Sequence, residues 1–150
     1  MLGGTLLAVA GCADPSAPAE PPDAELATLR TAIVTETALI QMYDAARKAQ
    51  PGLARRLRAP LHHHQSHLAR LNSRVADASP SASPSPSASA PPAKPRLPRG
   101  NAAVLHALRA AERAASDERT RQLARVSPSL AQLLASIAAC EFGHVAALSD

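Results

Sequence analysis

Six side chains with metal-binding chemistry occur at positions where a helical core would otherwise be apolar. They are three glutamates and three histidines: Glu36, His64, His67, Glu112, Glu141 and His144. Burying an unpaired carboxylate costs several kcal/mol, so glutamates on a core-facing stripe need a compensating partner. Carboxylate oxygens and neutral imidazole nitrogens are suitable ligands for Fe, Mn and Zn. The sequence therefore predicts either a metal centre or a buried polar network at these positions.

The first three of these residues are expected at one height of a helical hairpin. Glu36 lies roughly four helical turns before Pro51, which with Gly52 marks a break between helices. His64 and His67 lie at similar distances, roughly four helical turns, after Pro51. Because the helices of an antiparallel hairpin run side by side from the turn, positions at similar distances from it face each other.

The second half of the chain repeats this arrangement around Ser127. Glu112 lies roughly four helical turns before that serine. Glu141 and His144 lie roughly four to five helical turns after it. Side chains at i and i+3 project from one helix face, so both can reach one centre. If the positions form a metal centre, one ion would be bound by Glu36 and His67 and the other by Glu112 and His144. Glu141 would be able to bridge the two ions.

Four helices must position these residues. Apolar residues recur every three or four positions, which is typical of helices that bury one face. The expected helices span residues 24–50, 53–76 and 101–126 and continue from 128 onward, with N-caps at Asp23, Asn101 and Ser127 and a kink at Pro60. Short turns make each pair an antiparallel hairpin, at residues 24–77 and 101–150.

Low-complexity segments precede and separate the two hairpins. Residues 78–100 consist mostly of Ser, Pro and Ala, which predicts a disordered connector long enough to run the whole bundle. Residues 13–23 are rich in Pro, Ala and acidic residues and predict a disordered tether. Residues 1–12 resemble a bacterial lipoprotein signal segment in which Cys12 is lipidated. The alternative is an apolar N-terminus without such a role.

The order of these features resembles the ferritin-like fold, in which a long connection joins the second helix to the third. More narrowly, the chain resembles a ferritin-like domain of unknown function found in bacterial lipoproteins. The likeness rests on these residues: Glu36 with Tyr43 two turns later, Glu112, and Glu141-x-x-His144. His64-x-x-His67 stands where the resemblance implies Glu-x-x-His. The expected fold is therefore an all-α, ferritin-like four-helix bundle over residues 24–150.

Two functions of different classes are compatible with this resemblance. The first is a non-catalytic binding module of unknown ligand, in which the polar residues form a structural network. The second is a di-metal protein that binds Fe, Mn or Zn and has metal-handling or oxidase activity. Histidine in place of a glutamate at position 64 removes a bridging carboxylate, which favours the first.

The predicted location is the outer face of the bacterial cytoplasmic membrane. There the lipid on Cys12 would anchor the chain. A second copy of the chain or another envelope protein is the expected partner.

Composition argues against several other classes of protein. The chain has one Tyr, one Phe and no Trp, which is too few rings to stack the bases of single-stranded nucleic acid. Its net charge of +4 comes from arginines spread over helical positions, which predicts a solvated surface and no nucleic-acid partner. The sequence contains no Gly-rich phosphate loop, nucleophile elbow or Cys-x-x-Cys pair.

Several neighbours of the six residues are expected to have ordinary structural roles. His62 and His63 are expected to point to solvent, and Cys140 to be a small core residue. The other charged residues of segment 109–125 are expected on an exposed helix face. Tyr43 is expected either in the core beside the polar layer or as a hydrogen-bond donor to it.

Overall fold

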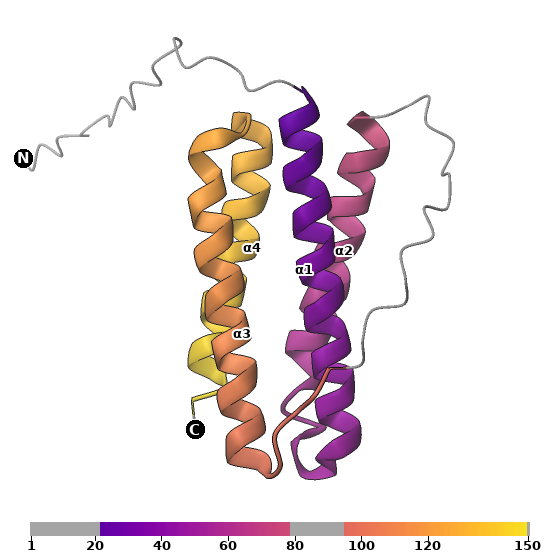
Figure 1. Cartoon of the computed structure of the whole chain (residues 1–150), viewed down its shortest axis with the longest axis vertical. Helices are drawn as coiled ribbons and strands as arrows, with labels where there is room; N and C mark the ends of the chain where they lie inside the picture. Colours follow the sequence, from indigo (N-terminus) through magenta and orange to yellow (C-terminus); the bar gives the residue numbers. More distant parts are fainter. Residues whose placement is uncertain (1–21, 79–94, 150) are drawn as a thin grey trace, which may run out of the picture.

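The computed structural model describes residues 22–78 and 95–149, and this part of the chain is an all-α bundle of four helices (Figure 1). The prediction of an all-α four-helix bundle is therefore confirmed. The helices are α1 (Pro22–Ala49), α2 (Arg58–Ala78), α3 (Asn101–Gln122) and α4 (Pro128–Ala147). Single 3₁₀ turns at Pro51–Leu53 and Leu123–Arg125 lie between the helices of each pair.

The four helices form two antiparallel hairpins packed against each other. Helix α1 pairs with α2 and α3 pairs with α4, while α1 also contacts α3 and α2 contacts α4. Helix α2 ends and α3 begins at opposite ends of the bundle, so these two helices run in the same direction (Figure 1). The chain between them therefore joins opposite ends of the bundle.

Three predicted segments lie wholly or largely outside the described residues. They are the signal segment 1–12 with Cys12, the tether as far as residue 21, and residues 79–94 of the connector. Helix α1 begins at Pro22, slightly earlier than expected. Helix α2 ends at Ala78 and α3 begins at Asn101, close to the predicted limits of the two hairpins.

The residues at which the helices begin differ from the sequence prediction in three details. Asp23 lies inside the first turn of α1 rather than before it. The N-cap of α3 is Gly100, not Asn101, and its φ of 88° suits a residue without a Cβ. Ser127 precedes α4 as predicted, with Pro128 at the first helical position, but its side chain makes no capping hydrogen bond.

Pro60 marks the start of α2 rather than a kink within it. Residues 51–57 form turns, so the helix begins at Arg58 and not near residue 53. The first-turn N–H groups of a helix have no intrahelical acceptor, so a proline there removes no helical hydrogen bond. The predicted kink was therefore wrong.

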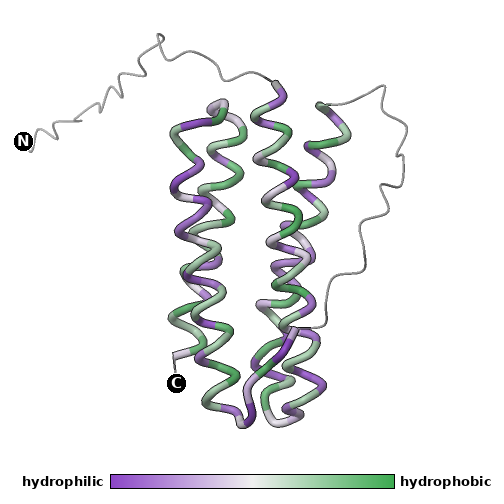
Figure 2. The backbone as a smooth tube through the Cα atoms, viewed as in Figure 1, coloured by the Kyte–Doolittle hydropathy of each residue, from purple (hydrophilic) through white to green (hydrophobic). Residues whose placement is uncertain are grey.

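The core consists of two apolar clusters with a polar layer between them. One cluster lies toward the Pro51 turn and includes Ala46, Leu53, Leu57, Leu61, Val104, Leu108 and Leu148. The other lies toward the Ser127 turn and includes Leu29, Ala32, Leu71, Leu130, Leu134 and Ile137. Figure 2 shows hydrophobic and hydrophilic residues alternating along each helix, as expected for helices that bury one face.

Within the described residues, α4 is the one helix long and apolar enough to cross a membrane by length and composition. Core helices of soluble proteins pass the same test. Its buried residues include Glu141 and His144, which belong to the polar layer of the bundle. In this fold one face of α4 packs into the core of the bundle.

Candidate functional site

The predicted inner face of each helix is confirmed at the six polar positions. Glu36, His64, Glu112 and Glu141 are completely buried, His144 is almost completely buried, and His67 is half-buried. They come from all four helices and meet at the middle of the bundle, as their distances from the two turns predict. These four fully buried residues lie together with a fifth, Arg119, which is described below. We call the five residues the buried layer: Glu36, His64, Glu112, Arg119 and Glu141.

His64 joins two glutamates from different hairpins. Its Nδ1 lies 2.9 Å from Glu36 Oε2, and its Nε2 lies 2.9 Å from Glu112 Oε1. Both ring nitrogens therefore face acceptors, which requires both to carry a proton. Burial lowers the pKa of His64, but the two glutamates outweigh this effect and raise it to about 9. His64 is thus a buried imidazolium at neutral pH.

Glu112 accepts hydrogen bonds from three helices on one oxygen. Its Oε1 accepts from the Tyr43 hydroxyl, from His64 and, at 3.1 Å, from His144 Nδ1. Burial raises the pKa of Glu112, but these donors outweigh burial and lower it to about 2. Burial and the carboxylate raise the pKa of the Tyr43 hydroxyl, so it remains a donor. Tyr43 therefore fulfils both of its predicted roles.

Arg119 is the member of the layer that the sequence analysis missed. Its side chain is fully buried, with Nη2 donating to Glu36 Oε1 at 2.8 Å and lying 3.3 Å from Glu141 Oε1. The prediction that the remaining charges of segment 109–125 are exposed was wrong at this position. The signal was present, because Arg119 lies about two helical turns after Glu112 and so shares its helix face.

Glu36 and Glu141 respond differently to the shared arginine. Burial raises the pKa of Glu36, but the hydrogen bond from His64 and the charges of His64 and Arg119 hold it far below its usual range. Burial raises the pKa of Glu141 to about 8, helped by the nearby carboxylates and only partly opposed by Arg119. Glu141 is therefore largely protonated at neutral pH, whereas Glu36 is charged.

These protonation states make the buried layer electrically balanced. Glu36 and Glu112 carry negative charges, and His64 and Arg119 carry positive ones. An uncompensated charge in this interior would be costly. The chain itself supplies both cations that the two carboxylates need.

The candidate ligands lie in two overlapping groups. Donor atoms of Glu36, His64 and His67 lie within 4.8 Å of one another, and so do those of His64, Glu112 and His144. The predicted pairing of Glu36 with His67 corresponds to a 3.7 Å separation, and His64 belongs to both groups. Glu141, the predicted bridge, is in neither group and lies beside Arg119 instead.

Several buried polar atoms of these residues have no hydrogen-bond partner within the described part of the chain. They are His67 Nδ1, Glu112 Oε2, Arg119 Nε and Nη1, and both carboxylate oxygens of Glu141. Buried polar atoms are normally satisfied by protein, water or an ion. The layer therefore retains hydrogen-bonding capacity on its Glu141 side.

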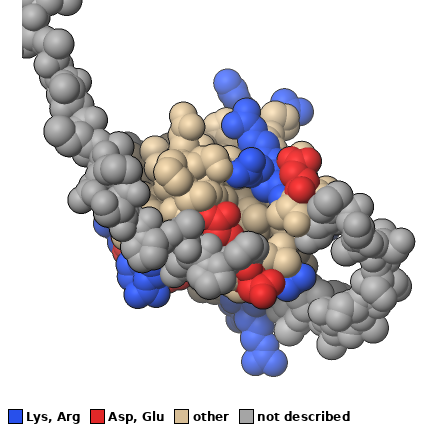
Figure 3. Space-filling model, turned by 90° about the horizontal axis from the view of Figure 1, so that it is seen from above, with Lys and Arg blue, Asp and Glu red and all other residues tan. Residues whose placement is uncertain are grey.

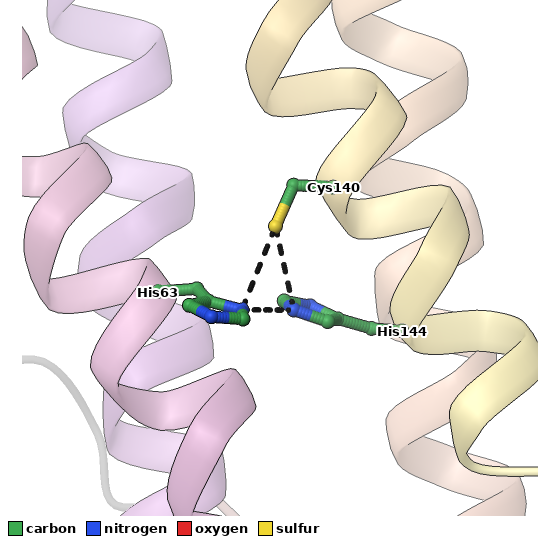
Figure 4. Close-up of side chains that lie close together, drawn as sticks. All are labelled: His63, Cys140 and His144. Atoms are coloured by element: carbon green, nitrogen blue, oxygen red, sulfur yellow. Dashed lines mark hydrogen bonds between the residues drawn. The ribbon is translucent and has the colours of Figure 1, made fainter.

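A second polar cluster lies at the surface between α2 and α4, and we call it the outer triad: His63, Cys140 and His144 (Figure 4). His63 is exposed as predicted, yet its ring nitrogen reaches His144. Cys140 is only half-buried and contacts both imidazoles, so its assignment as an ordinary core residue was wrong. Burial and the nearby carboxylates raise the pKa of the Cys140 thiol, which does not favour a nucleophilic role.

A surface hollow of about 330 Å³ opens at the end of the bundle where α1 begins. Its lining residues are Asp23, Glu25, Leu26, Leu29, Arg74, Asp77, Ala78 and Leu130. Figure 3 views the molecule from this end and shows acidic and basic side chains close together on it. The hollow is a mixed-charge surface without a set of convergent catalytic groups.

Fold and site together define this chain as a four-helix protein with a buried, charge-balanced Glu/His/Arg layer and a separate His/Cys cluster at its edge. No protein-family model, curated protein or solved structure matches it.

Proposed function

We propose that this chain is an extracytoplasmic lipoprotein whose ferritin-like four-helix domain is a non-catalytic binding module. The observation that carries this proposal is the position of Arg119, whose guanidinium lies between Glu36 and Glu141. With the His64 imidazolium it balances the buried carboxylates, so the layer can serve as a structural polar network. A di-metal site would instead use these carboxylates as ligands.

The helix arrangement supports the ferritin-like part of the proposal. Helices α2 and α3 run in the same direction, so the chain between them joins opposite ends of the bundle and is a crossover connection (Figure 1). Ferritin-like bundles have one such crossover, whereas up-and-down bundles have short loops throughout. The inward-facing Glu36, Glu112 and Glu141-x-x-His144 agree with the same resemblance.

The envelope location rests on the sequence of segment 1–23. A lipid on Cys12 and a short tether would hold the bundle near a membrane, with the start of α1 toward it. The mixed-charge hollow at that end of the bundle then offers a surface for a polar partner.

A di-metal protein is the second candidate function, and two observations favour it. The donor atoms of the two ligand groups are close enough to share ions, and oxygens of Glu112 and Glu141 have no hydrogen-bond partner among the described residues. The ligands would be Glu36, His64, His67, Glu112, Glu141 and His144, binding Fe, Mn or Zn. To ligate, His64 would have to lose its proton, and Arg119 would have to leave the carboxylates.

Metal content separates these two functions. The full chain is prepared without a tag and with Cys12→Ser and Cys140→Ala, so that any ion counted is held by the buried layer. Elemental analysis is compared with the same chain carrying Glu112→Gln. We expect no stoichiometric Fe, Mn or Zn in either protein and no loss of stability on chelation. One or two equivalents of metal that disappear with Glu112→Gln would instead establish the di-metal function.

The lipoprotein assignment has its own test. The full chain is expressed in a bacterial host, and the mature protein is analysed by mass spectrometry and membrane fractionation. We expect a membrane-bound protein that begins at a lipidated Cys12, and a Cys12→Ala variant that is not processed at this position. A soluble protein that retains Met1 would contradict the envelope location.

A further inference from the structure

Three metal-ligating atoms converge at the seam between α2 and α4, outside the buried layer. Cys140 Sγ lies 3.5 Å from His144 Nε2 and 3.6 Å from His63 Nδ1, and the two nitrogens are 3.0 Å apart (Figure 4). We propose that the outer triad is a binding site for Zn²⁺ or a chemically similar divalent transition-metal ion. This site does not depend on the function proposed above, because its thiol and His63 take no part in the buried layer.

The separations of the three atoms fit tetrahedral coordination. Zinc binds imidazole nitrogen at about 2.0–2.1 Å and thiolate sulfur at about 2.3 Å. With tetrahedral angles, these lengths place two nitrogens about 3.3 Å apart and a nitrogen and a sulfur about 3.6 Å apart. Both observed nitrogen–sulfur separations agree, and the two nitrogens need to move apart by only a few tenths of an ångström.

The hydrogen bond between His144 and Glu112 orients the triad. Nδ1 of His144 lies 3.1 Å from Glu112 Oε1, and the carboxylate is the acceptor of this bond. The opposite nitrogen, Nε2, therefore presents its lone pair toward His63 and Cys140. Metal-binding histidines almost always donate their other N–H to a carboxylate or a carbonyl, which fixes the tautomer and the ring orientation. Glu112 fills this role here.

The ligand set selects the class of ion. Two imidazoles and a thiolate suit zinc and neighbouring transition metals, whereas Mg²⁺ and Ca²⁺ prefer oxygen ligands. On binding, the Sγ–H bond of Cys140 breaks, the sulfur bonds to the metal, and the proton passes to solvent. The proton that His63 Nδ1 donates to His144 Nε2 is lost to solvent and His63 is protonated on its other ring nitrogen instead, which frees Nδ1 to bind the metal. Three protein ligands leave one tetrahedral position for water or another ligand. The exposed His63 makes this position accessible from solvent.

The position of the triad gives the ion a structural consequence. Cys140 and His144 lie one turn apart on α4, while His63 belongs to α2 in the other hairpin. Helices α2 and α4 contact each other less extensively than the helices within each hairpin do. An ion bound by all three residues would cross-link the two hairpins directly.

Cobalt binding to the full chain tests the proposal. All proteins carry Cys12→Ser, which leaves Cys140 as the only thiol. Co²⁺ is titrated while the near-ultraviolet charge-transfer band from thiolate to Co²⁺ and the visible bands of tetrahedral Co²⁺ are recorded. Zn²⁺ is then added to displace the cobalt. We expect one equivalent of Co²⁺ with a thiolate band, displaced by one equivalent of Zn²⁺.

Three variants identify the ligands. Cys140→Ala should abolish the thiolate band, and His63→Ala should weaken cobalt binding by at least about tenfold. His62→Ala is the matched control, because His62 is an exposed neighbour outside the triad, and it should bind cobalt as the parent does. Circular dichroism verifies that each variant is folded. A cobalt complex without a thiolate band, binding that survives Cys140→Ala, or no binding at all would overturn the proposal.

Discussion

The buried layer and the outer triad are built from similar residues and share the Glu112–His144 hydrogen bond, yet they differ in how their charges and lone pairs are used. In the buried layer, His64 and Arg119 already neutralise the carboxylates. The outer triad contains no carboxylate. Its thiol lies beside two imidazole nitrogens.

This difference follows from depth in the fold. A charge in the bundle interior must be paired within the protein, because water cannot reach it. The chain meets this requirement with its own cations, so an ion entering the buried layer would have to displace them. At the edge of the bundle solvent relaxes the requirement, so neutral donors can remain available to a metal.

Of the substitutions we propose, removal of Arg119 from the buried layer should change the stability of the protein most. Arg119→Met leaves Glu36 buried without its guanidinium partner and should lower the free energy of unfolding by about 3–5 kcal/mol. Urea unfolding followed by circular dichroism measures the change. Arg121→Met is the control, since Arg121 pairs with Glu118 on the exposed face and should matter little. A similar small loss for Arg119→Met would mean that the buried layer does not depend on this cation.

Zinc should stabilise the protein through the outer triad alone. At a free concentration of one hundred times its Kd, the ion should raise the free energy of unfolding by about 2.7 kcal/mol. Urea unfolding with and without zinc measures this gain, which Cys140→Ala should eliminate. If the gain persists in Cys140→Ala, the buried layer rather than the triad binds the ion.

Removing the Tyr43 hydroxyl should cause a smaller loss of stability. Tyr43→Phe removes one of three hydrogen bonds to Glu112 Oε1 and should cost about 1.5 kcal/mol, the lower end for bonds to charged groups. Thermal or urea unfolding measures it. Thr31→Ala is the control, because that hydroxyl bonds only a backbone carbonyl on the exposed face of α1. Equal effects of the two substitutions would show that Glu112 gains nothing from Tyr43.

The pH dependence of stability should be the most gradual effect. Folding raises the pKa of Glu141 from 4.5 to about 8 and that of His64 from 6.5 to about 9. Between the two values for each group, the native state binds more protons than the unfolded state. Stability should therefore fall as pH rises through these ranges, by at most about 1.4 kcal/mol per pH unit for each group. The lowered pKa values of Glu36 and Glu112 make stability fall again below pH 4.5.

Unfolding measured from pH 3 to 9 should accordingly show a maximum in mildly acidic solution. Glu141→Gln replaces the protonated carboxyl with a neutral group of the same shape. It should leave stability near pH 4 unchanged and remove part of the decline between pH 4.5 and 8. An unchanged pH profile in this variant would contradict the protonated state of Glu141.

The hairpins and the depth of the polar residues could be predicted because they depend on local spacing. A three-to-four-residue apolar period fixes which face of each helix is buried, and the distance from a turn fixes the height of each residue in an antiparallel pair. Glu36, His64, Glu112, Glu141 and His144 followed from these two quantities. Cap residues and the start of α2 were less predictable, because they depend on backbone angles near turns.

What the sequence could not determine was which polar groups satisfy one another. Arg119 lies in a charge-rich stretch like its exposed neighbours, and only the packing of α1 and α4 against α3 placed Glu36 and Glu141 beside its guanidinium. Likewise His63 and Cys140 come from different hairpins, and no spacing along the chain relates them. Helical period and turn position are properties of each segment alone, so the sequence determined the bundle and its polar level. Contacts between side chains of different helices depend on how the helices are rotated and packed, so only the tertiary structure decided which carboxylates were neutralised and where a thiol met two imidazoles.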